Sequence, residues 1–454
     1  MTDLTFKKIK SARQLAFDAL YQIFEKEAYA NLAVQEILRQ FPLIREEKKL
    51  LTELVYGVCR RYNYLLWIIE QLSTRSIKKL HPTVRILLCI ALYQLIYLDR
   101  IPESAAVNET VKISKKITHV GNSRFINGIL RNFLRKKNQI VLPMKNENPI
   151  AYYSLKYNVP EWLVQYWTES WGMPRTERIL VAFQEQPLMC IRVNTLKMSA
   201  EDLKKRLSDE KISFETVPYT RDAFIIKQRA DLIFGDLLQN GLIYIQSISS
   251  MMPAIILEAR PQEKILDMCA APGSKTTYLA SFMENRGTID AWDIYPHKIN
   301  LIRENAKRLG ISIIHAEVKD STRSYPTLYN TYDKVLLDAP CSGLGVINHK
   351  PEIKWRRSEA DLMEFPKIQK KLLKNASRYI KKDGILVYST CTLNKKENEN
   401  IIEEFLSSHP GFVSVDFSIP VAGESKNGMM TLWPDQFGSD GFFLAKLRKV
   451  YNET

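Results

Sequence analysis

Strand-like and helical stretches alternate through the C-terminal half of the chain, and this rhythm limits the folds available to it. From residue 241 onward, short apolar runs are separated by helical patterns. The predicted strands are Lys264–Asp267, Thr288–Asp293, Ile311–His315, Lys334–Asp338 and Ile385–Tyr388. Alternating β and α segments predict a mostly parallel, doubly wound sheet. Ligands of such sheets bind at the carboxyl ends of the strands, so functional residues are expected directly after each run.

Acidic residues stand at four successive strand ends. Asp267 and Asp293 end the first two predicted strands, Asp320 follows the third and Asp338 ends the fourth. An acid in this position can accept hydrogen bonds from ribose hydroxyls. Asp293 could instead cap a helix that begins near Pro296. One such acid would be unremarkable, but four together indicate a nucleoside-type cofactor.

A loop of small residues follows the first strand. It comprises Cys269, Ala270, Ala271, Pro272, Gly273 and Ser274, and it leads into Lys275. Small residues let backbone amides approach a ligand closely. The loop is not a G-x-G-x-x-G fingerprint, and it is not a P-loop because Ser274 stands where that motif requires glycine. We therefore expect a ligand without phosphate groups near this loop.

Cys341 and Cys391 are the predicted chemical residues, because each follows a strand at the same edge of the sheet. Cys391 lies just before a helix expected to begin near Asn394, and a helix N-terminus lowers the pKa of a thiol. Buried small hydrophobes are the expected role of Cys59, Cys89 and Cys190. The cysteines form no C-x-x-C pair and the histidines show no ligand spacing, so no metal site is expected.

The N-terminal third is predicted to be an all-α bundle with a strong positive charge. Apolar residues recur with helical spacing at Phe17–Phe24, Leu51–Val58 and Leu65–Leu72. Residues 1–150 carry 25 Lys or Arg against 13 Asp or Glu, whereas the whole chain has a net charge of +15. Nearly all of the excess is therefore N-terminal, which favours a polyanionic partner.

The last helix of this bundle carries a basic cluster. It is expected to begin at Ser123, a candidate N-cap. Its cations are Arg124, Arg131, Arg135, Lys136 and Lys137. Cations also suit the C-terminal end of a helix dipole, which accounts for part of the cluster. Nucleic acid is the partner that we expect to bind here, and Lys354, Arg356 and Arg357 offer a second possible RNA path.

The chain divides into three predicted domains. Residues 1–140 form the helical RNA-binding bundle, residues 141–238 form linker helices with a small α/β, RRM-like subdomain, and residues 239–454 form the Rossmann-like catalytic domain. No apolar segment follows the basic residues of Met1–Lys10, and the run Ile86–Leu98 is too short to span a bilayer. Together with the scattered cysteines, this predicts a cytoplasmic protein with reduced thiols.

Several motifs resemble those of RNA cytosine-5 methyltransferases that use S-adenosyl-L-methionine. They are Cys269–Thr276, the stretch from Asp338 to Gly343, and Tyr388–Leu393. Pro351–Trp355, Glu397–Glu399 and Gly441–Ala445 extend the resemblance over residues 150–450. The N-terminal bundle, with Gly121–Asn127, looks like the NusB-type RNA-binding fold. This pairing is similar to bacterial methyltransferases of 16S ribosomal RNA.

The resemblance implies an activity and assigns roles to residues. Cys391 would be the nucleophile, Asp338 would bind the edge of the base, Cys341 would assist product release and Lys275 would contact the base. The cofactor would be S-adenosyl-L-methionine, held by residues 269–275 with Asp293, Asp320 and Asp338. The partner would be small-subunit ribosomal RNA, and the protein a monomer that needs neither metal nor membrane.

Two other interpretations remain open at this point. The substrate could be transfer RNA or another ribosomal RNA site. The chain could also be a non-catalytic RNA-binding or antitermination factor built on a decayed methyltransferase scaffold, although Cys391 and Asp338 are both present.

Overall fold

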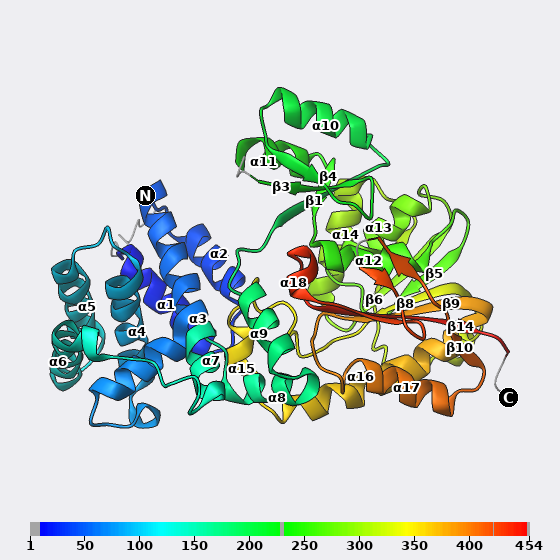
Figure 1. Cartoon of the computed structure of the whole chain (residues 1–454). Helices are drawn as coiled ribbons and strands as arrows, with labels where there is room; N and C mark the ends of the chain where they lie inside the picture. Colours follow the sequence, from blue (N-terminus) through cyan, green and yellow to red (C-terminus); the bar gives the residue numbers. More distant parts are fainter. Residues whose placement is uncertain (1–9, 228–230, 421, 452–454) are drawn as a thin grey trace. The chain divides into compact units, whose positions relative to one another are not determined.

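The computed structural model describes residues 10–227, 231–420 and 422–451. Two compact units make up the chain (Figure 1). Unit 1 contains residues 1–181 and 349–358, whereas unit 2 contains residues 182–348 and 359–454. The chain therefore leaves unit 2, contributes a short segment to unit 1 and returns.

Unit 1 is helical, as predicted for its N-terminal part. Its helices are α1 (Ala12–Glu25), α2 (Ala30–Gln40), α3 (Arg45–Leu72), α4 (Pro82–Tyr97), α5 (Glu103–Ile117), α6 (Val120–Lys136), α7 (Pro149–Tyr157), α8 (Glu161–Trp171), α9 (Met173–Ala182) and α15 (Ile353–Arg356), with short 3-10 turns η1 (Ile77–Lys79) and η2 (Lys137–Gln139). The apolar faces of α1 to α6 meet in one core, in which Leu15, Leu54 and Leu88 are fully buried. None of the helices in the described ranges is long and apolar enough to cross a membrane.

Two helix boundaries differ from the prediction. The periodic stretches around Leu54 and Ile68 belong to one continuous helix, α3, because residues 59–64 between them contain neither glycine nor proline. Helix α6 begins at Val120 with His119 as its N-cap. Ser123 is not the cap: it lies inside the first turn, where its backbone N–H donates to the carbonyl of His119.

The inserted segment 349–358, which we call the strap, is anchored to the bundle through hydrogen bonds. The buried carboxylate of Glu352 accepts from the backbone N–H of Ala30 at 3.1 Å, at the start of α2. The indole of Trp355 donates to the carbonyl oxygen of Cys59 at 2.6 Å and packs edge-on against Tyr62. The strap is therefore an integral part of unit 1.

A small α/β subdomain opens unit 2, as predicted. Strands β1 (Met189–Val193), β2 (Phe214–Thr216), β3 (Ala223–Ile226) and β4 (Ile243–Ile245) form an antiparallel sheet in the order β2-β3-β1-β4. Helices α10 (Ala200–Asp209) and α11 (Asp231–Gln239) accompany it. Apolar side chains such as Ile191, Leu203 and Phe224 form its separate core.

The large sheet of unit 2 confirms the Rossmann-like prediction. Strands β5 (Lys264–Asp267), β6 (Thr288–Asp293), β7 (Ile314–Val318), β8 (Tyr332–Asp338) and β9 (Ile380–Thr390) are parallel, and β14 (Phe442–Lys449) pairs antiparallel with β9. The order is β10-β14-β9-β8-β5-β6-β7, where β10 is Phe412–Ser414 and β13 (Met429–Leu432) also pairs with β14. Strands β11 (Ser418–Ile419) and β12 (Gly423–Glu424) form a separate small ribbon.

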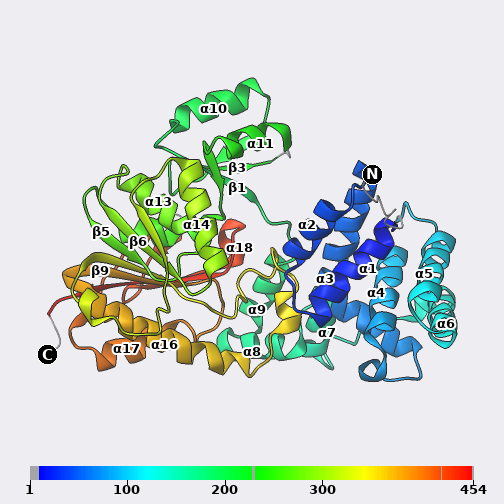
Figure 2. The same cartoon turned by 180° about the vertical axis from the view of Figure 1, so that it is seen from behind.

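Helices cover both faces of this sheet. Helices α12 (Ile248–Leu257), α13 (Ser274–Phe282) and α14 (Pro296–Leu309) lie on one face, whereas α16 (Asp361–Tyr379) and α17 (Glu399–Ser408) lie on the other (Figure 1 and Figure 2). The short η3 (Pro326–Leu328) precedes β8, and α18 (Pro434–Phe437) precedes β14. Burial on both faces explains the continuous apolar runs from which the strands were predicted.

The predicted strands agree with the structure except at the third. The bounds of β5 and β6 are those predicted, and β8 and β9 extend theirs. The third strand was predicted at residues 311–315 but β7 spans Ile314–Val318. Ile311 and Ile313 are buried in the turn between α14 and β7, so their apolar character marks packing rather than strand.

Candidate active site

The loop after β5 wraps from the strand end into helix α13. The backbone N–H of Ala270 donates to the carbonyl of Trp292 on β6 at 2.8 Å, and Gly273 N–H donates to the carbonyl of Ala270 at 2.7 Å. Gly273 precedes α13 with φ of +97°, a conformation that L side chains rarely adopt. Cys269, Ala271, Pro272 and Ser274 line the same turn, as predicted from their position in the sequence.

Carboxylates follow the loop at the ends of the next two strands. Asp293 is buried, and its Oδ1 accepts from the backbone N–H of Tyr295 at 3.1 Å while Lys298 lies 3.5 Å from its Oδ2. Tyr295, and not Asp293, is the N-cap of α14. Asp320 is half-buried, and hydrogen bonds from Thr322 lower its pKa.

Asp267, at the end of β5, was not among the predicted ligands, but its contacts make it a candidate site residue. Its Oδ2 accepts from Thr276 Oγ1 at 2.7 Å, but its buried Oδ1 has no hydrogen-bond partner among the described residues. Burial raises its pKa to about 7. Its position as the first residue of the strand-end motif was the signal available in the sequence.

This set of groups fits S-adenosylmethionine. Side-chain acceptors at the ends of β5, β6 and β7 match a ligand whose polar edges are an ammonium group and ribose hydroxyls, all of which donate. The unpartnered oxygen of Asp267 offers an acceptor to such a donor. In the loop, the backbone N–H groups of Ala270 and Gly273 are already bonded within the fold and Pro272 has none, and nothing in the loop requires a phosphate.

Lys275 and Asp338 form an ion pair at the ends of β5 and β8. Lys275 Nζ lies 2.6 Å from Asp338 Oδ2, and Ser389 Oγ donates to the other carboxylate oxygen at 2.7 Å. Burial opposes the charge of Lys275, but the carboxylate of Asp338, assisted by Cys391, outweighs it and the pKa of Lys275 is raised. The lysine therefore carries a positive charge near Cys391.

The two predicted chemical residues lie in contact. Cys341 Sγ is 3.4 Å from Cys391 Sγ, although the residues are 50 positions apart in the chain. The hydrogen bond with Cys391, followed by burial, raises the pKa of Cys341 well above its usual value. Neighbouring parallel strands β8 and β9 bring the two thiols together, as predicted.

The helix expected at Asn394 begins later. Helix α17 starts at Glu399, and residues 391–398 form a loop held by the side chains of Asn394 and Asn398. Cys391 therefore lies outside the first turn of a helix, and the predicted effect of a helix dipole on its thiol is wrong. The charged group near Cys391 is the side chain of Lys275.

A polar cluster lies behind the thiols; three of its residues belong to motifs named in the sequence, but their clustering was not predicted. Glu397, Ser342, Thr392 and Gln369 are buried and hydrogen-bonded to one another. Three other cysteines behave as predicted: Cys59, Cys89 and Cys190 are buried, and burial raises their pKa values.

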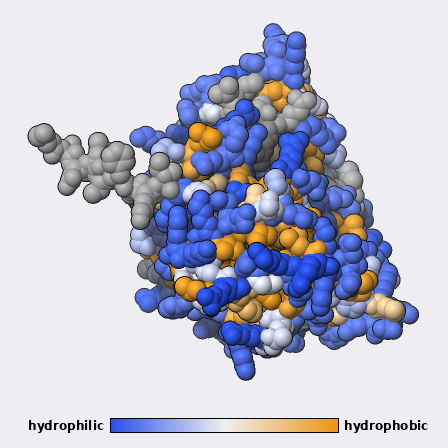
Figure 3. Space-filling view, turned by 90° about the vertical axis from the view of Figure 1, so that its left-hand side faces the viewer, coloured by the Kyte–Doolittle hydropathy of each residue, from blue (hydrophilic) through white to orange (hydrophobic). Residues whose placement is uncertain are grey.

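The basic cluster of α6 is exposed on unit 1. Arg124, Arg131, Arg135, Lys136 and Lys137 are all exposed, and Lys137 pairs with Glu103 at 2.7 Å. Figure 3 views the side on which α5 and α6 lie in Figure 1, and hydrophilic side chains predominate there. The cluster is therefore accessible to a polyanion.

The alternative RNA path through the strap is wrong for two of its three cations. Lys354 is buried and donates to the carbonyl of Arg60 at 3.3 Å. Arg356 donates to the carbonyls of Ile23 and Ala28. These side chains bind backbone oxygens of the bundle because the strap packs into unit 1.

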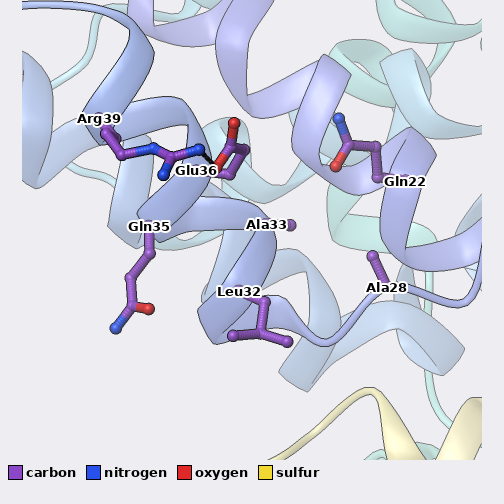
Figure 4. A pocket seen from close by; sticks show the side chains of 7 residues that line it. All are labelled: Gln22, Ala28, Leu32, Ala33, Gln35, Glu36 and Arg39. Carbon is purple, nitrogen blue, oxygen red and sulfur yellow. Dashed lines mark hydrogen bonds and ion pairs between the residues drawn. The ribbon is translucent and has the colours of Figure 1, made fainter. Parts of the chain in front are cut away.

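A pocket of about 400 Å³ opens on unit 1, and none of the predicted site residues lines it. It lies beside α1 and α2, where Glu36 pairs with Arg39 at 2.7 Å (Figure 4). Its lining residues are Gln22, Ala28, Leu32, Ala33, Gln35, Glu36 and Arg39. It contains no nucleophile.

Across the described ranges, no group of three His, Cys, Asp or Glu side chains is arranged to hold a metal.

Three family models match successive parts of the chain. The NusB family matches residues 10–135 and the ferredoxin-like domain of RsmF/B-like methyltransferases matches residues 159–232. The model of 16S rRNA methyltransferase RsmB/F matches residues 254–448. The helical bundle, the small sheet and the large sheet each have a counterpart.

Relatives match over nearly the whole chain. A probable ribosomal RNA small subunit methyltransferase B of Bacillus subtilis is 36% identical and covers 97% of this chain and 99% of its own. The ribosomal RNA small subunit methyltransferase B of Cronobacter sakazakii is 31% identical over 98% of this chain and all of its own length (100%).

Solved structures resemble the chain as well. The crystal structure of PH0851 has a TM-score of 0.83 at 28% identity and covers 96% of this chain and 98% of its own. A methyltransferase homolog from Pyrococcus horikoshii has a TM-score of 0.59 at 33% identity over 66% of this chain and 99% of its own. NSun6 from the same organism, solved with SFG, has a TM-score of 0.59 at 25% identity, covering 64% of this chain and 99% of its own.

The groups that fit S-adenosylmethionine, the order of the three folds and the full-length relatives all indicate the same family. The chain therefore belongs to the family of ribosomal RNA small subunit methyltransferase B, whose members use S-adenosylmethionine to methylate ribosomal RNA.

Proposed function

We propose that the protein methylates C5 of one cytosine in 16S ribosomal RNA through a covalent bond between Cys391 and C6 of the base. The observation that carries this proposal is the pair of thiols, 3.4 Å apart, beside the Lys275–Asp338 ion pair. C5 of cytosine is a weak nucleophile, so the base must be activated before it can accept a methyl group. A cysteine and an acid side by side at one sheet edge suit that task.

Cys391 would begin the reaction. Its thiolate adds to C6, which turns C4–C5–C6 into an enamine-like system. The proton of the Cys391 thiol would pass by way of the Asp338 carboxylate to N3, where electron density builds as the sulfur adds, and Lys275 would hold that carboxylate in place. S-adenosylmethionine, when bound, supplies an electrophilic methyl group for C5.

Cys341 would act in the second half of the reaction, in which the product is released. After methyl transfer, a water molecule would take the proton from C5, so that the electrons of that C–H bond restore the C5–C6 double bond and the Cys391 thiolate is expelled. Cys341 lies against the leaving sulfur and its raised pKa keeps it protonated. It is therefore placed to protonate or hydrogen-bond the departing thiolate, which favours release of the product.

The remaining assignments form part of the same proposal. Residues 269–275 with Asp293, Asp320 and Asp338 line the cofactor side, and the α6 cluster binds RNA phosphates.

A cytosine stacked in a duplex is unreachable, so the target is a loop base or a flipped base. The domains would be residues 1–140, 141–238 and 239–454, except that β4 completes the small sheet and residues 349–358 belong to unit 1. Six free thiols support a reducing, cytoplasmic location.

Bisulfite sequencing of cellular RNA with and without the gene tests the proposal. Loss of a single protected cytosine in 16S rRNA is expected. Loss of a cytosine signal in transfer RNA or at another rRNA site would change the substrate. An unchanged map, together with absent methyl transfer by the purified protein, would support a non-catalytic RNA-binding factor. Light scattering of the purified protein tests the proposed monomer.

A further inference from the structure

The carboxylate of Glu397 is fully buried behind the two cysteines. It is 0% exposed and accepts hydrogen bonds from four donors. Oε2 accepts from the backbone N–H of Ser342 and from Gln369 Nε2, both at 2.9 Å. Oε1 accepts from Ser342 Oγ and from Asn394 Nδ2, the latter at 2.8 Å. Burying an ionised group is costly unless its lone pairs are satisfied, and here they are.

These bonds join the residues that directly follow the two cysteines. Ser342 follows Cys341, and Thr392 follows Cys391. Their hydroxyl oxygens lie 2.7 Å apart. Because Ser342 gives its single hydroxyl hydrogen to Glu397, Thr392 donates to Ser342. The hydrogen bonds therefore run from Thr392 to Ser342 and from Ser342 to Glu397. They link the loop of Cys391 to the loop of Cys341 and end at the carboxylate.

Further bonds fix the two loops on the same support. Gln369 Nε2, while bonded to Glu397, also donates to the carbonyl of Pro340 at 3.0 Å. Asn398, the next residue after Glu397, donates to the carbonyl of Thr392 at 2.9 Å. Tyr388 donates its hydroxyl to the carbonyl of Glu397 at 2.7 Å. Both loops are thus fastened to Glu397 and Asn398.

We propose that Glu397 is a positioning residue that holds the thiols of Cys341 and Cys391 at contact distance. The tie through Ser342 and Thr392 sets the separation of the loops, and the charge of the carboxylate aligns the donors. Glu397 also adds to the raised pKa of Cys341, after its hydrogen bond with Cys391 and burial. The part of this inference that concerns product release rests on the proposed function, whereas the distance between the thiols does not.

The first test measures thiol geometry in the free full-length protein. Wild type and Glu397→Gln are equilibrated in glutathione redox buffers, and the disulfide between Cys341 and Cys391 is quantified by peptide mass after alkylation. The glutamine side chain places an amide N–H₂ group, which is a donor, against N–H and O–H groups that donate to the carboxylate in wild type. The effective concentration of the two thiols is expected to fall by about tenfold or more, as for one lost hydrogen bond to a charged group.

Glu399→Gln is the matched control. Glu399 lies two positions away and is partly buried, and its Oε1 accepts from Thr431 on β13 at 3.1 Å rather than from a residue of the cysteine loops. The effective concentration of the thiols in this variant is expected to stay within about twofold of wild type. If Glu397→Gln does not fold, Ser342→Ala removes the hydroxyl tie with a smaller change and should act in the same direction. An unchanged thiol equilibrium in folded Glu397→Gln or Ser342→Ala overturns the proposal.

A second readout separates positioning from general destabilisation. With RNA and cofactor, Glu397→Gln is expected to accumulate covalent RNA–protein complex and to lose kcat, whereas KM for S-adenosylmethionine stays within about twofold. If wild type and Cys341→Ala form no covalent complex, the proposed chemistry fails while the thiol equilibrium still decides the role of Glu397. If Glu397→Gln instead lost kcat and cofactor affinity equally and kept the wild-type thiol–disulfide equilibrium, Glu397 would have a merely structural role.

Discussion

The sulfur atoms of Cys341 and Cys391 lie 3.4 Å apart, at the ends of two strands that the chain visits 50 residues apart. Each thiol follows one of the neighbouring parallel strands β8 and β9, so the sheet itself sets their proximity. Two adjacent thiols allow one to form a bond to carbon while the other carries a proton. This arrangement leads directly to the first prediction.

Replacing each cysteine by alanine should give opposite results. Cys391→Ala is expected to abolish both methylation and covalent adduct. Cys341→Ala should instead accumulate an RNA–protein complex that survives denaturing gels, because expulsion of the Cys391 thiolate loses its assistance. Cys190→Ala, in the small sheet, is the control and should behave as wild type. Accumulation in Cys391→Ala would reverse the two roles.

Asp293→Ala should weaken binding of S-adenosylmethionine by roughly 1.5–3 kcal/mol, the range for hydrogen bonds to charged groups. The buried carboxylate at the end of β6 is expected to accept from the ribose hydroxyls. Isothermal calorimetry measures the change. Glu304→Ala, which removes an exposed acid from α14, should leave the affinity unchanged. Equal affinities for wild type and folded Asp293→Ala would remove Asp293 from the cofactor site.

The α6 cluster should dominate the salt dependence of RNA binding. Each lost phosphate contact flattens the log–log slope by about 0.7–0.9. Replacing Arg131, Arg135 and Lys136 by Gln is therefore expected to reduce the slope by roughly two to three units if all three contact phosphates. Filter binding over a range of salt concentrations measures the slope.

An equal loss of charge elsewhere provides the control for that experiment. Gln substitutions at Lys205, Lys211 and Lys382, three exposed lysines of unit 2, should change the slope much less. Cofactor affinity should stay constant in both triple variants. Equal slopes for the two variants would identify the α6 cluster as a solvated helix end that responds only to net charge.

Lys354 should make the stability of unit 1 depend on pH. Burial, followed by the nearby charge of Arg61, lowers its pKa from 10.5 to about 7. The unfolded chain therefore holds the proton more tightly than the folded one. Its contribution to stability is complete above pH 10.5 and is lost as the pH falls towards 7, by on the order of 4 kcal/mol.

Urea unfolding of wild type and Lys354→Met at several pH values between about 7 and 10 measures this effect. The wild type should lose stability on acidification relative to the variant, because methionine cannot take up a proton. Lys350→Met, at an exposed position of the same strap, should follow the wild type. Parallel curves for wild type and Lys354→Met would show that the folded bundle tolerates the charge.

The fold followed from the sequence where physical chemistry acts locally. Parallel strands buried on both faces leave continuous apolar runs, so β5 and β6 were predicted to the residue. The cysteines could be placed together because parallel strands end at one edge. The support behind them could not, because Glu397 and Ser342 meet through side chains 55 positions apart and leave no periodic trace.

The sequence-based predictions were wrong where hydrogen bonds from side chains, rather than regular backbone hydrogen bonds, hold the chain. The delayed start of α17 depends on Asn394 and Asn398, whose side chains hold a loop where helical residues would also fit. The strap cations looked like an RNA path because their charge is visible in the sequence, whereas the bundle carbonyls that bind them are not. Charge patterns show what a residue carries and not whether it is exposed.

The strap also bears on how the protein is made. Glu352 bonds to Ala30 across 322 positions, and Trp355 bonds to Cys59 across 296. During synthesis the first helices emerge from the ribosome long before these partners exist, so the bundle can take up its last hydrogen bonds only after residue 358 has been translated. A fragment that stops at residue 181 would expose backbone groups that the strap covers. A version designed for isolated study of the bundle should therefore carry residues 349–358 back to it through a linker.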